Sequence, residues 1–129
     1  MERHITETLT HMGKKMGFPD FTTNAHGILH LSITNIGELF IDIQQSSIFL
    51  YLLNAFPVLN FKLISTAYLF CEEKAKYNFI TNPVLQGEDM LGFAIKIRKE
   101  DFSLVVLEGA VNQLIDTTTR LRQFADHFE

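Results

Sequence analysis

The stretch Ser47-Ile48-Phe49-Leu50-Tyr51-Leu52-Leu53 predicts a β-strand that is apolar on both faces. Successive side chains of a strand point to opposite sides of its sheet. The two sides here carry Ile48, Leu50 and Leu52 on one face and Phe49, Tyr51 and Leu53 on the other. An antiparallel sheet in a small protein usually buries one face and leaves the other in water. A strand without a polar face therefore needs a second cover, which is either the protein's own helices or another chain.

The preceding strand, predicted over residues 38–44, indicates which face is the core. Its side chains alternate between Leu39, Ile41 and Ile43 on one face and Glu38, Phe40 and Asp42 on the other. The first set makes the better core face because it is wholly aliphatic. We therefore expect Phe49 and Tyr51 to lie on the open face. The opposite assignment would expose the row that contains Leu50.

The N-terminal part of the chain predicts a helix followed by these strands. Ile5, Leu9, Met12 and Met16 are spaced as one face of a helix, which Gly17 ends. A strand over residues 28–33 follows a polar loop. A turn at residues 35–37 leads into the strand over residues 38–44, and residues 45–46 form a connection of hairpin length.

The rest of the chain predicts a second helix, two strands and a third helix. We expect the middle helix over residues 58–77, a loop over 81–89 and a strand over 90–98. A charged turn over residues 99–101, a last strand over 102–107 and a final helix over 111–128 follow. Thr118 shares the apolar face of the final helix, and Arg122 lies on its polar side. The order helix, three strands, helix, two strands, helix predicts an α+β fold with an antiparallel sheet capped by helices. We expect one domain over residues 1–129.

Composition narrows the class of partner. The net charge of −4 argues against a general nucleic-acid or anionic-membrane binder. The hydrophobic fraction of 47% is high for so small a protein and indicates either surface covered by partners or a generous core. Cys71 is the one cysteine, which excludes an intramolecular disulfide and fits a buried thiol in a reducing cytoplasm. The N-terminus shows no signal-peptide core, and the apolar run at residues 58–71 is too short to span a bilayer.

Residues with catalytic or metal-binding potential do not form a recognisable set. His26 and His30 are four apart, and His4 and His11 are seven apart, but neither pair has a third ligand nearby. No histidine is spaced to activate Cys71 as a nucleophile. The carboxylates lie on strand faces, a helix end and a loop, where they are solvated. We expect no catalytic residue, no metal site and no cofactor, so the excess apolar surface predicts a protein that binds other chains.

Three segments resemble a known family. Residues 9–18, ending in Met16-Gly17-Phe18, look like an opening helix closed by a glycine and an apolar residue. Residues 39–43 and 48–52 look like a central strand pair, and residues 114–125 look like a closing helix. With the order of elements, the length and the acidic pI, they resemble the small type III secretion chaperones of the Tir-chaperone kind (class I). The chain departs from that family after the middle helix, where residues 71–78 are largely polar and a longer loop follows.

The resemblance implies a dimer built on the middle helix and the fourth strand. Mapped onto this chain, the interface consists of Leu59, Leu63, Ile64, Ala67, Tyr68 and Cys71, with Phe93 and Ile95 nearby. The predicted middle helix suits this role because a helix that is apolar nearly all round is buried on more than one side. A central core helix in a monomer is the alternative.

The resemblance also implies that the dimer holds an extended, unfolded segment of a secreted effector or apparatus protein. Apolar grooves and strand addition would bind it. The candidate partner-binding residues are Leu9, Met12, Met16, Phe40, Phe49 and Tyr51. For Met12 and Met16, ordinary core packing is the alternative.

Three functions follow from these observations. The first is an ATP-independent secretion chaperone in the bacterial cytoplasm that keeps its partner soluble and export-competent, as a homodimer or as a heterodimer with a related chaperone. The second is a stand-alone adaptor or regulator with the same fold. The third is a small thioesterase-like enzyme, which would need a catalytic carboxylate or histidine against a helix N-terminus that the sequence does not place.

Overall fold

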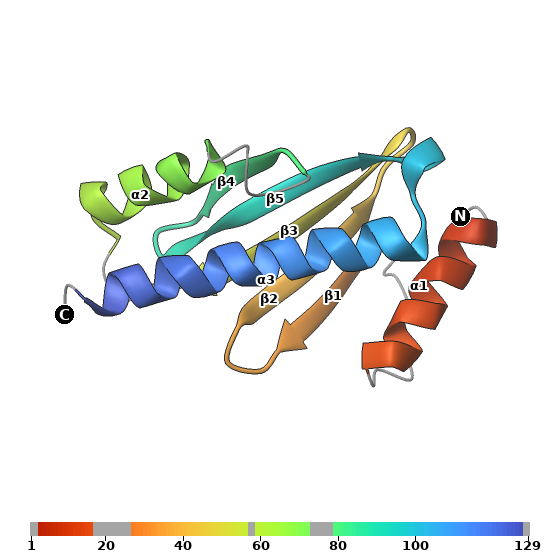
Figure 1. The fold of residues 1–129 in the computed structure, drawn as a ribbon, viewed down its shortest axis with the longest axis horizontal. Helices are drawn as coiled ribbons and strands as arrows, with labels where there is room; N and C mark the ends of the chain where they lie inside the picture. The colour runs from red at the N-terminus through yellow and green to blue at the C-terminus, as the bar shows by residue number, and fades with distance from the viewer. Residues whose placement is uncertain (1–2, 17–26, 57–58, 73–78, 128–129) are drawn as a thin grey trace.

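The computed structural model describes residues 3–16, 27–56, 59–72 and 79–127. It is an α+β fold with a five-stranded sheet and three α-helices (Figure 1). The elements are α1 (Arg3–Met16), β1 (Ile28–Ile33), β2 (Gly37–Ile43), β3 (Ser47–Ala55), α2 (Phe61–Cys71), β4 (Thr81–Gln86), β5 (Met90–Arg98), the 3₁₀ turn η1 (Lys99–Asp101) and α3 (Leu104–Asp126).

The sheet is antiparallel throughout, with the strand order β1-β2-β3-β5-β4. β3 is therefore the central strand, and β1 and β4 are the edges. α3 crosses one face of the sheet and contacts β3 and β5 (Figure 1). α1 packs beside the start of α3, and α2 packs against α3 and β4 (Figure 1). The described helices thus leave the opposite face of the sheet uncovered.

The face prediction for β3 is confirmed. Ile48, Leu50 and Leu52 have no exposed surface and lie under α3. On the opposite face Phe49 and Tyr51 are only half-buried, but Leu53 is 1% exposed, so that face is open at the first two residues and closed at the third. The neighbouring strands continue the core row in register, because Leu50 pairs with Ile41 of β2 and with Ile95 of β5. Burying one such aliphatic side chain contributes about 2 kcal/mol, so this row is a substantial part of the hydrophobic core.

The strand predicted over residues 90–98 is confirmed as β5, but the position of the other C-terminal strand was wrong. Residues 81–89 were expected to form a loop, but Thr81–Gln86 is β4. The breaker Pro83 is tolerated because β4 is an edge strand, where a missing N–H can face outward. The expected strand over residues 102–107 is instead the start of α3. The Ser103 side chain caps this helix by accepting a hydrogen bond from the Val106 N–H at 3.2 Å.

Two details of the helices also differ from expectation. α2 begins at Phe61 rather than at residue 58, because the Oδ1 atom of Asn60 accepts a hydrogen bond from the Leu63 N–H at 2.8 Å and caps the helix there. The expected continuation over residues 73–77 lies outside the described residues. Arg122, expected on the polar side of α3, is half-buried and hydrogen-bonded to Asn54 of β3.

Candidate protein-binding surfaces

The uncovered face of the sheet carries a row of stacked rings, which we call the aromatic row: His30, Phe40 and Tyr51. The strand register aligns them, since His30 pairs with Phe40 and Phe40 pairs with Tyr51. The ring centroids of His30 and Phe40 are 4.4 Å apart, and those of Phe40 and Tyr51 are 5.0 Å apart. The interplanar angles of 9° and 13° make both contacts stacked. The row therefore forms a continuous apolar strip across three strands.

Charged groups lie on both sides of the aromatic row. Nε2 of His30 is 3.6 Å from a carboxylate oxygen of Glu38. On the other side, Asp42 is the cross-strand neighbour of Phe49, and the Lys96 ammonium lies 5.7 Å from the centroid of the Phe49 ring. Partial burial, and to a lesser extent the Asp42 carboxylate, raise the pKa of Tyr51. An apolar strip bordered by charges of both signs suits recognition of a polypeptide rather than of one small molecule.

Strand addition is open at two places. β1 and β4 are the edges of the described sheet, and an extended chain adds to a sheet at an edge strand. β1 is the edge next to the aromatic row. An extended chain bound along β1 could therefore add backbone hydrogen bonds to contacts with the rings.

The candidate partner-binding residues on the first helix occupy a different environment. Leu9 and Met12 are each 2% exposed and belong to the hydrophobic core on the helix-covered side of the sheet. Met16 is the last residue of α1, and its side chain lies outside the described part. The structure therefore brings Phe40, Phe49 and Tyr51 together on one face and places Leu9 and Met12 in the core.

α2 is apolar on two sides, as the sequence predicted. Its inner side holds Leu63 and Ala67, which are buried against the domain. Its outer side exposes Phe61 (86%), Tyr68 (55%) and Leu69 (60%), a set we call the outer stripe of α2. These positions fall on one helical face because they are spaced seven and eight residues apart. A stripe of three large exposed apolar side chains is unusual for a surface that stays in water.

The predicted dimer-interface residues divide between core and surface. Leu59, Ile64 and Cys71 are half-buried, Leu63 and Ala67 are buried, and Tyr68 is exposed. Phe93 and Ile95 were chosen as members of the fourth strand, but that strand is β4. Both lie on β5 in the centre of the core. The half-exposed Leu85 is an apolar side chain of β4, at that edge of the sheet.

Sequence reasoning missed Phe61, Leu69 and His30 as surface candidates. The Asn60 cap could have set the start and phase of α2 and shown that Phe61 and Tyr68 share a face. His30 was considered only together with His26, as a candidate metal ligand. Only the register of β1 against β2 reveals that it stacks on Phe40.

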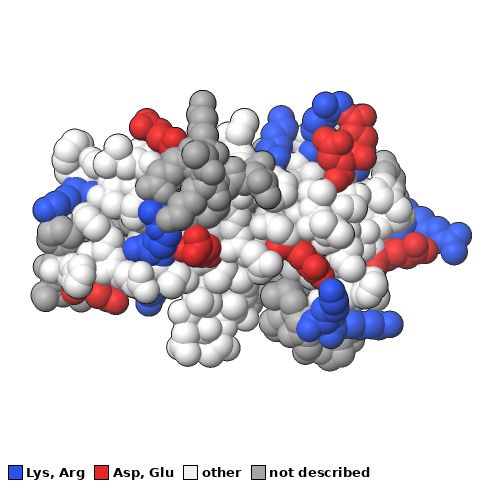
Figure 2. All heavy atoms as spheres, in the orientation of Figure 1, with Lys and Arg blue, Asp and Glu red and all other residues white. Residues whose placement is uncertain are grey.

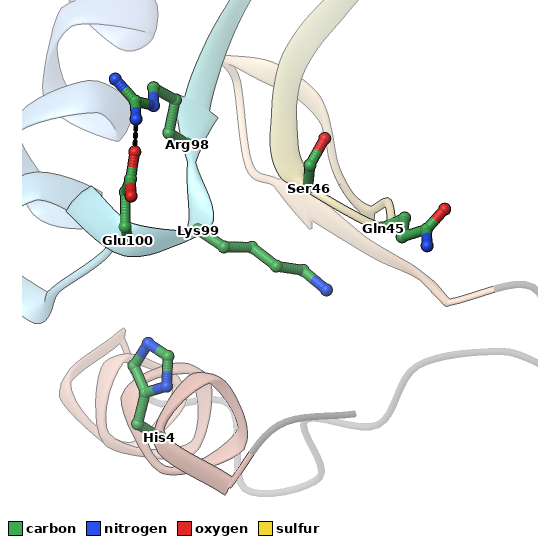
Figure 3. A pocket seen from close by; sticks show the side chains of 6 residues that line it. All are labelled: His4, Gln45, Ser46, Arg98, Lys99 and Glu100. Carbon is green, nitrogen blue, oxygen red and sulfur yellow. Dashed lines mark ion pairs between the residues drawn. The ribbon is translucent and has the colours of Figure 1, made fainter.

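A hollow of about 520 Å³ lies where the start of α1 meets the β2–β3 turn and the end of β5 (Figure 3). The Lys99 side chain extends into it between His4 and Gln45, while Arg98 and Glu100 form an ion pair at its rim (Figure 3).

Within the described residues, no group of three His, Cys, Asp or Glu side chains could hold a metal ion. On the side seen in Figure 2, described basic and acidic residues intermingle rather than gather into one patch. No described helix is long and apolar enough to cross a membrane.

Comparisons with known proteins support the fold. No protein-family model matches the sequence, and no curated protein matches it. Among solved structures, the chain is similar to the Yersinia pestis type III secretion chaperone SycH, solved in complex with a stable fragment of YscM2. The TM-score is 0.65 at 15% sequence identity, and the match covers 89% of this chain and 97% of that one. This chain has the fold of that secretion chaperone.

Proposed function

We propose that this protein is a type III secretion chaperone that binds an extended segment of a secreted effector or apparatus protein. It acts without ATP in the bacterial cytoplasm and keeps that segment soluble and export-competent. The observation that carries the proposal is the aromatic row on the uncovered face of the sheet, since a strand buried on one side and aromatic on the other needs a partner. The likeness to SycH, a chaperone solved with a bound fragment of another protein, gives independent support at the level of the fold.

The binding mode follows from the geometry of the open face. A segment that adds to the β1 edge would place alternate side chains beside His30, at the end of the aromatic row, whereas a segment that lies across the open face would contact Phe40, Phe49 and Tyr51. Each aromatic contact is worth about 1 kcal/mol beyond the area it buries. Leu9, Met12 and Met16 remain part of the proposed surface, and Leu9 and Met12 would reach a partner only if α1 shifts from its position against α3.

We also propose that the chain is a dimer, with the outer stripe of α2 and the neighbouring β4 at its interface. Phe61, Tyr68 and Leu69 are exposed in the single chain and would be covered in the pair. The half-buried Leu59, Ile64 and Cys71 lie on the same helix or just before it and would extend the contact. The pair would consist either of two copies of this chain or of this chain with a related chaperone.

The second candidate is an adaptor or regulator that uses the same open face without a role in export. The same aromatic row supports this candidate, because the row would bind an extended apolar segment whether or not the bound protein is later exported. The identity of the bound protein separates the two. A secreted protein bound through its N-terminal segment supports the chaperone, and a transcription or signalling protein supports the regulator.

Site-specific photo-crosslinking in the native host tests the proposal. A photoreactive phenylalanine replaces Phe49 on the open face, and in a matched variant it replaces Asn112, which is exposed on α3. We expect the Phe49 variant to crosslink to the N-terminal region of a secreted protein and the Asn112 variant to leave that protein unlabelled. Equal labelling from both positions, or labelling from neither, would overturn the proposed binding face.

A further inference from the structure

The hydrogen-bond pattern of β1 shows which of its backbone groups face outward. The Ile43 N–H donates to the Gly27 carbonyl at 3.0 Å, so these two residues form a hydrogen-bonded pair where the β1–β2 ladder begins. In an antiparallel ladder such pairs alternate with pairs that exchange no hydrogen bond. The register makes His30–Phe40 a pair of the second kind. The N–H and C=O groups of His30, and by the same alternation those of Ser32, therefore point away from β2.

These outward groups lie at the edge of the described sheet. β1 is the last strand on its side (Figure 1), and His30 and Ser32 are both exposed. In the described part of the chain, the backbone N–H and C=O of these two residues take part in no hydrogen bond. An antiparallel strand that paired here would exchange two hydrogen bonds with each of them.

The aromatic row ends at the same edge. The His30 ring stacks on Phe40 with a centroid distance of 4.4 Å, and the His30 side chain is 50% exposed. A residue of an added strand that lies opposite His30 has its Cβ atom about 5 Å from that of His30, on the same face of the sheet. This spacing is close to the ring spacings along the row. An aromatic side chain at that position would therefore extend the stack by one ring.

Ser32 and Glu38 define a second contact of an added strand. Ser32 pairs with Glu38 of β2, whose side chain is 38% exposed. The Glu38 carboxylate lies 3.6 Å from Nε2 of His30, which is charged only when the imidazole is protonated. A strand that adds to β1 lies two strand spacings, about 10 Å, from β2. A lysine or arginine opposite Ser32 could extend over this small side chain toward Glu38, so the edge favours a basic residue there.

We propose that β1 binds an antiparallel segment of the partner that carries an aromatic residue opposite His30 and a basic residue opposite Ser32. In an antiparallel pair these two partner residues are separated by one residue, and the basic residue is nearer the N-terminus of the segment. The bound segment therefore reads basic, any residue, aromatic. The inference rests on the proposed function and adds to it the chemistry of the bound segment.

A second copy of β1 fits this edge less well. Two copies paired about His30 would place one imidazole opposite the other and Ile28 opposite Ser32. Protonation would then set like charges against each other, and an apolar side chain would face a polar one. Glu38 would gain no basic partner from this pairing. The charge of the edge therefore favours a partner segment over a second copy.

Hydrogen exchange measured by nuclear magnetic resonance on the full-length protein reads the register directly. The probe is acetyl-Thr-Lys-Thr-Phe-Thr-Val-Thr-amide, in which lysine and phenylalanine have the proposed spacing. We expect saturable binding that slows exchange of the His30 and Ser32 amides and leaves the Leu31 amide, which faces β2, little changed. No slowing at His30 and Ser32 up to the solubility limit of the probe would overturn the proposal. Slow exchange of both amides before the probe is added would also overturn it, because β1 would then already be paired with a second copy or with another part of the chain.

Matched probes and two variants test the side-chain chemistry. Cyclohexylalanine in place of the phenylalanine keeps its size and apolar character without a π-system, and that probe should bind about five-fold more weakly. Glutamine in place of the lysine should weaken binding about two-fold. His30→Leu should abolish the first difference, and Glu38→Gln should abolish the second. Equal affinity of the wild-type protein for either matched pair of probes would overturn the proposed chemistry of the segment, while slowed exchange at His30 would still support strand addition and with it the proposed function.

Discussion

Arg122 of α3 donates a hydrogen bond from Nη2 to Oδ1 of Asn54 on β3, at 2.8 Å. Asn54 is 6% exposed, and its Nδ2 group donates a second hydrogen bond, to the Ile36 carbonyl in the β1–β2 turn. One buried asparagine thus joins the long helix, the central strand and the turn. The core face of β3 is otherwise apolar from Ile48 to Leu52, so Asn54 marks where the core ends and a polar hydrogen-bonded cluster begins.

Asn54→Ala should destabilise the protein by about 2 kcal/mol, because it leaves the Ile36 carbonyl and the Arg122 guanidinium without their partner. Urea denaturation followed by circular dichroism measures this. Hydrogen exchange should also accelerate at the amides of the β1–β2 turn. The exchange rate of the β5 amides should change only as much as the loss of global stability requires. Thr34→Ala, at an exposed position of the same turn, is the control and should change the free energy of unfolding by less than about 0.5 kcal/mol. Equal effects from the two variants would contradict the connecting role of Asn54.

Gly92→Ala should be among the most damaging single substitutions in β5. A Cβ atom at this position would overlap the backbone carbonyl oxygen of Leu52, and backbone atoms of the central strand cannot move aside without breaking the sheet. We expect a loss of about 3 kcal/mol in the free energy of unfolding. Gly87→Ala has open space around it and only a left-handed backbone to strain, with φ of 64°. Gly87→Ala should lower the free energy of unfolding by about 1 kcal/mol. Thermal denaturation of both variants, measured side by side, checks that Gly92→Ala is the more damaging.

Cys71 should be a slow nucleophile in the native protein. Partial burial, and then repulsion from Glu72, raise the pKa of its thiol from 9.0 to about 11. At pH 8 the thiolate fraction, and hence the rate of alkylation by iodoacetamide, should be roughly a hundred-fold lower than in the unfolded chain. Because the folded state holds the proton more tightly, the stabilisation from the neutral thiol is present below pH 9 and is lost as the pH rises through about 11. Glu72→Gln should accelerate alkylation of the native protein, and an unchanged rate would contradict the electrostatic part of this account.

The outer stripe of α2 should control assembly. The wild-type chain should elute and scatter light with twice the 14.8 kDa mass of one chain. Phe61→Asp places a charge at an 86% exposed apolar position of the stripe and should give a monomer. Val105→Asp is the matched control, because Val105 is 80% exposed on α3, away from the stripe, and its variant should remain a dimer. A wild-type monomer at micromolar concentration would contradict the homodimer.

The faces of the central strands could be predicted from the sequence because alternation along a strand is a local property. The alternation of Leu39 and Ile41 with Phe40 and Asp42 was enough to place Phe40 and Tyr51 on the open side. β4 was missed because Asn82 and Pro83 resemble a turn, and the strand exists only through its pairing with β5. Such pairing is tertiary and leaves no periodic signal of its own.

The start of α3 was missed for a related reason. Residues 102–106 alternate like a strand, and the cap at Ser103 outweighs that pattern once the helix packs on the sheet. Predicting the outer stripe of α2 requires the phase of that helix. The predicted helix began three residues too early, so the shared face of the stripe residues was not recognised. Arg122 could not be assigned from helical spacing because its position is set by Asn54, 68 residues away in the chain.

Isothermal titration of the crosslinked partner segment, made as a synthetic peptide, tests the central claim most directly. The account predicts that Tyr51→Ala weakens binding at least about ten-fold relative to wild type, since it removes the ring that the central strand contributes to the aromatic row. Val105→Ala, an exposed apolar truncation on α3, should leave the affinity unchanged. Equal affinity of wild type and Tyr51→Ala for the segment would contradict the claim that the open face of the sheet is where the partner binds.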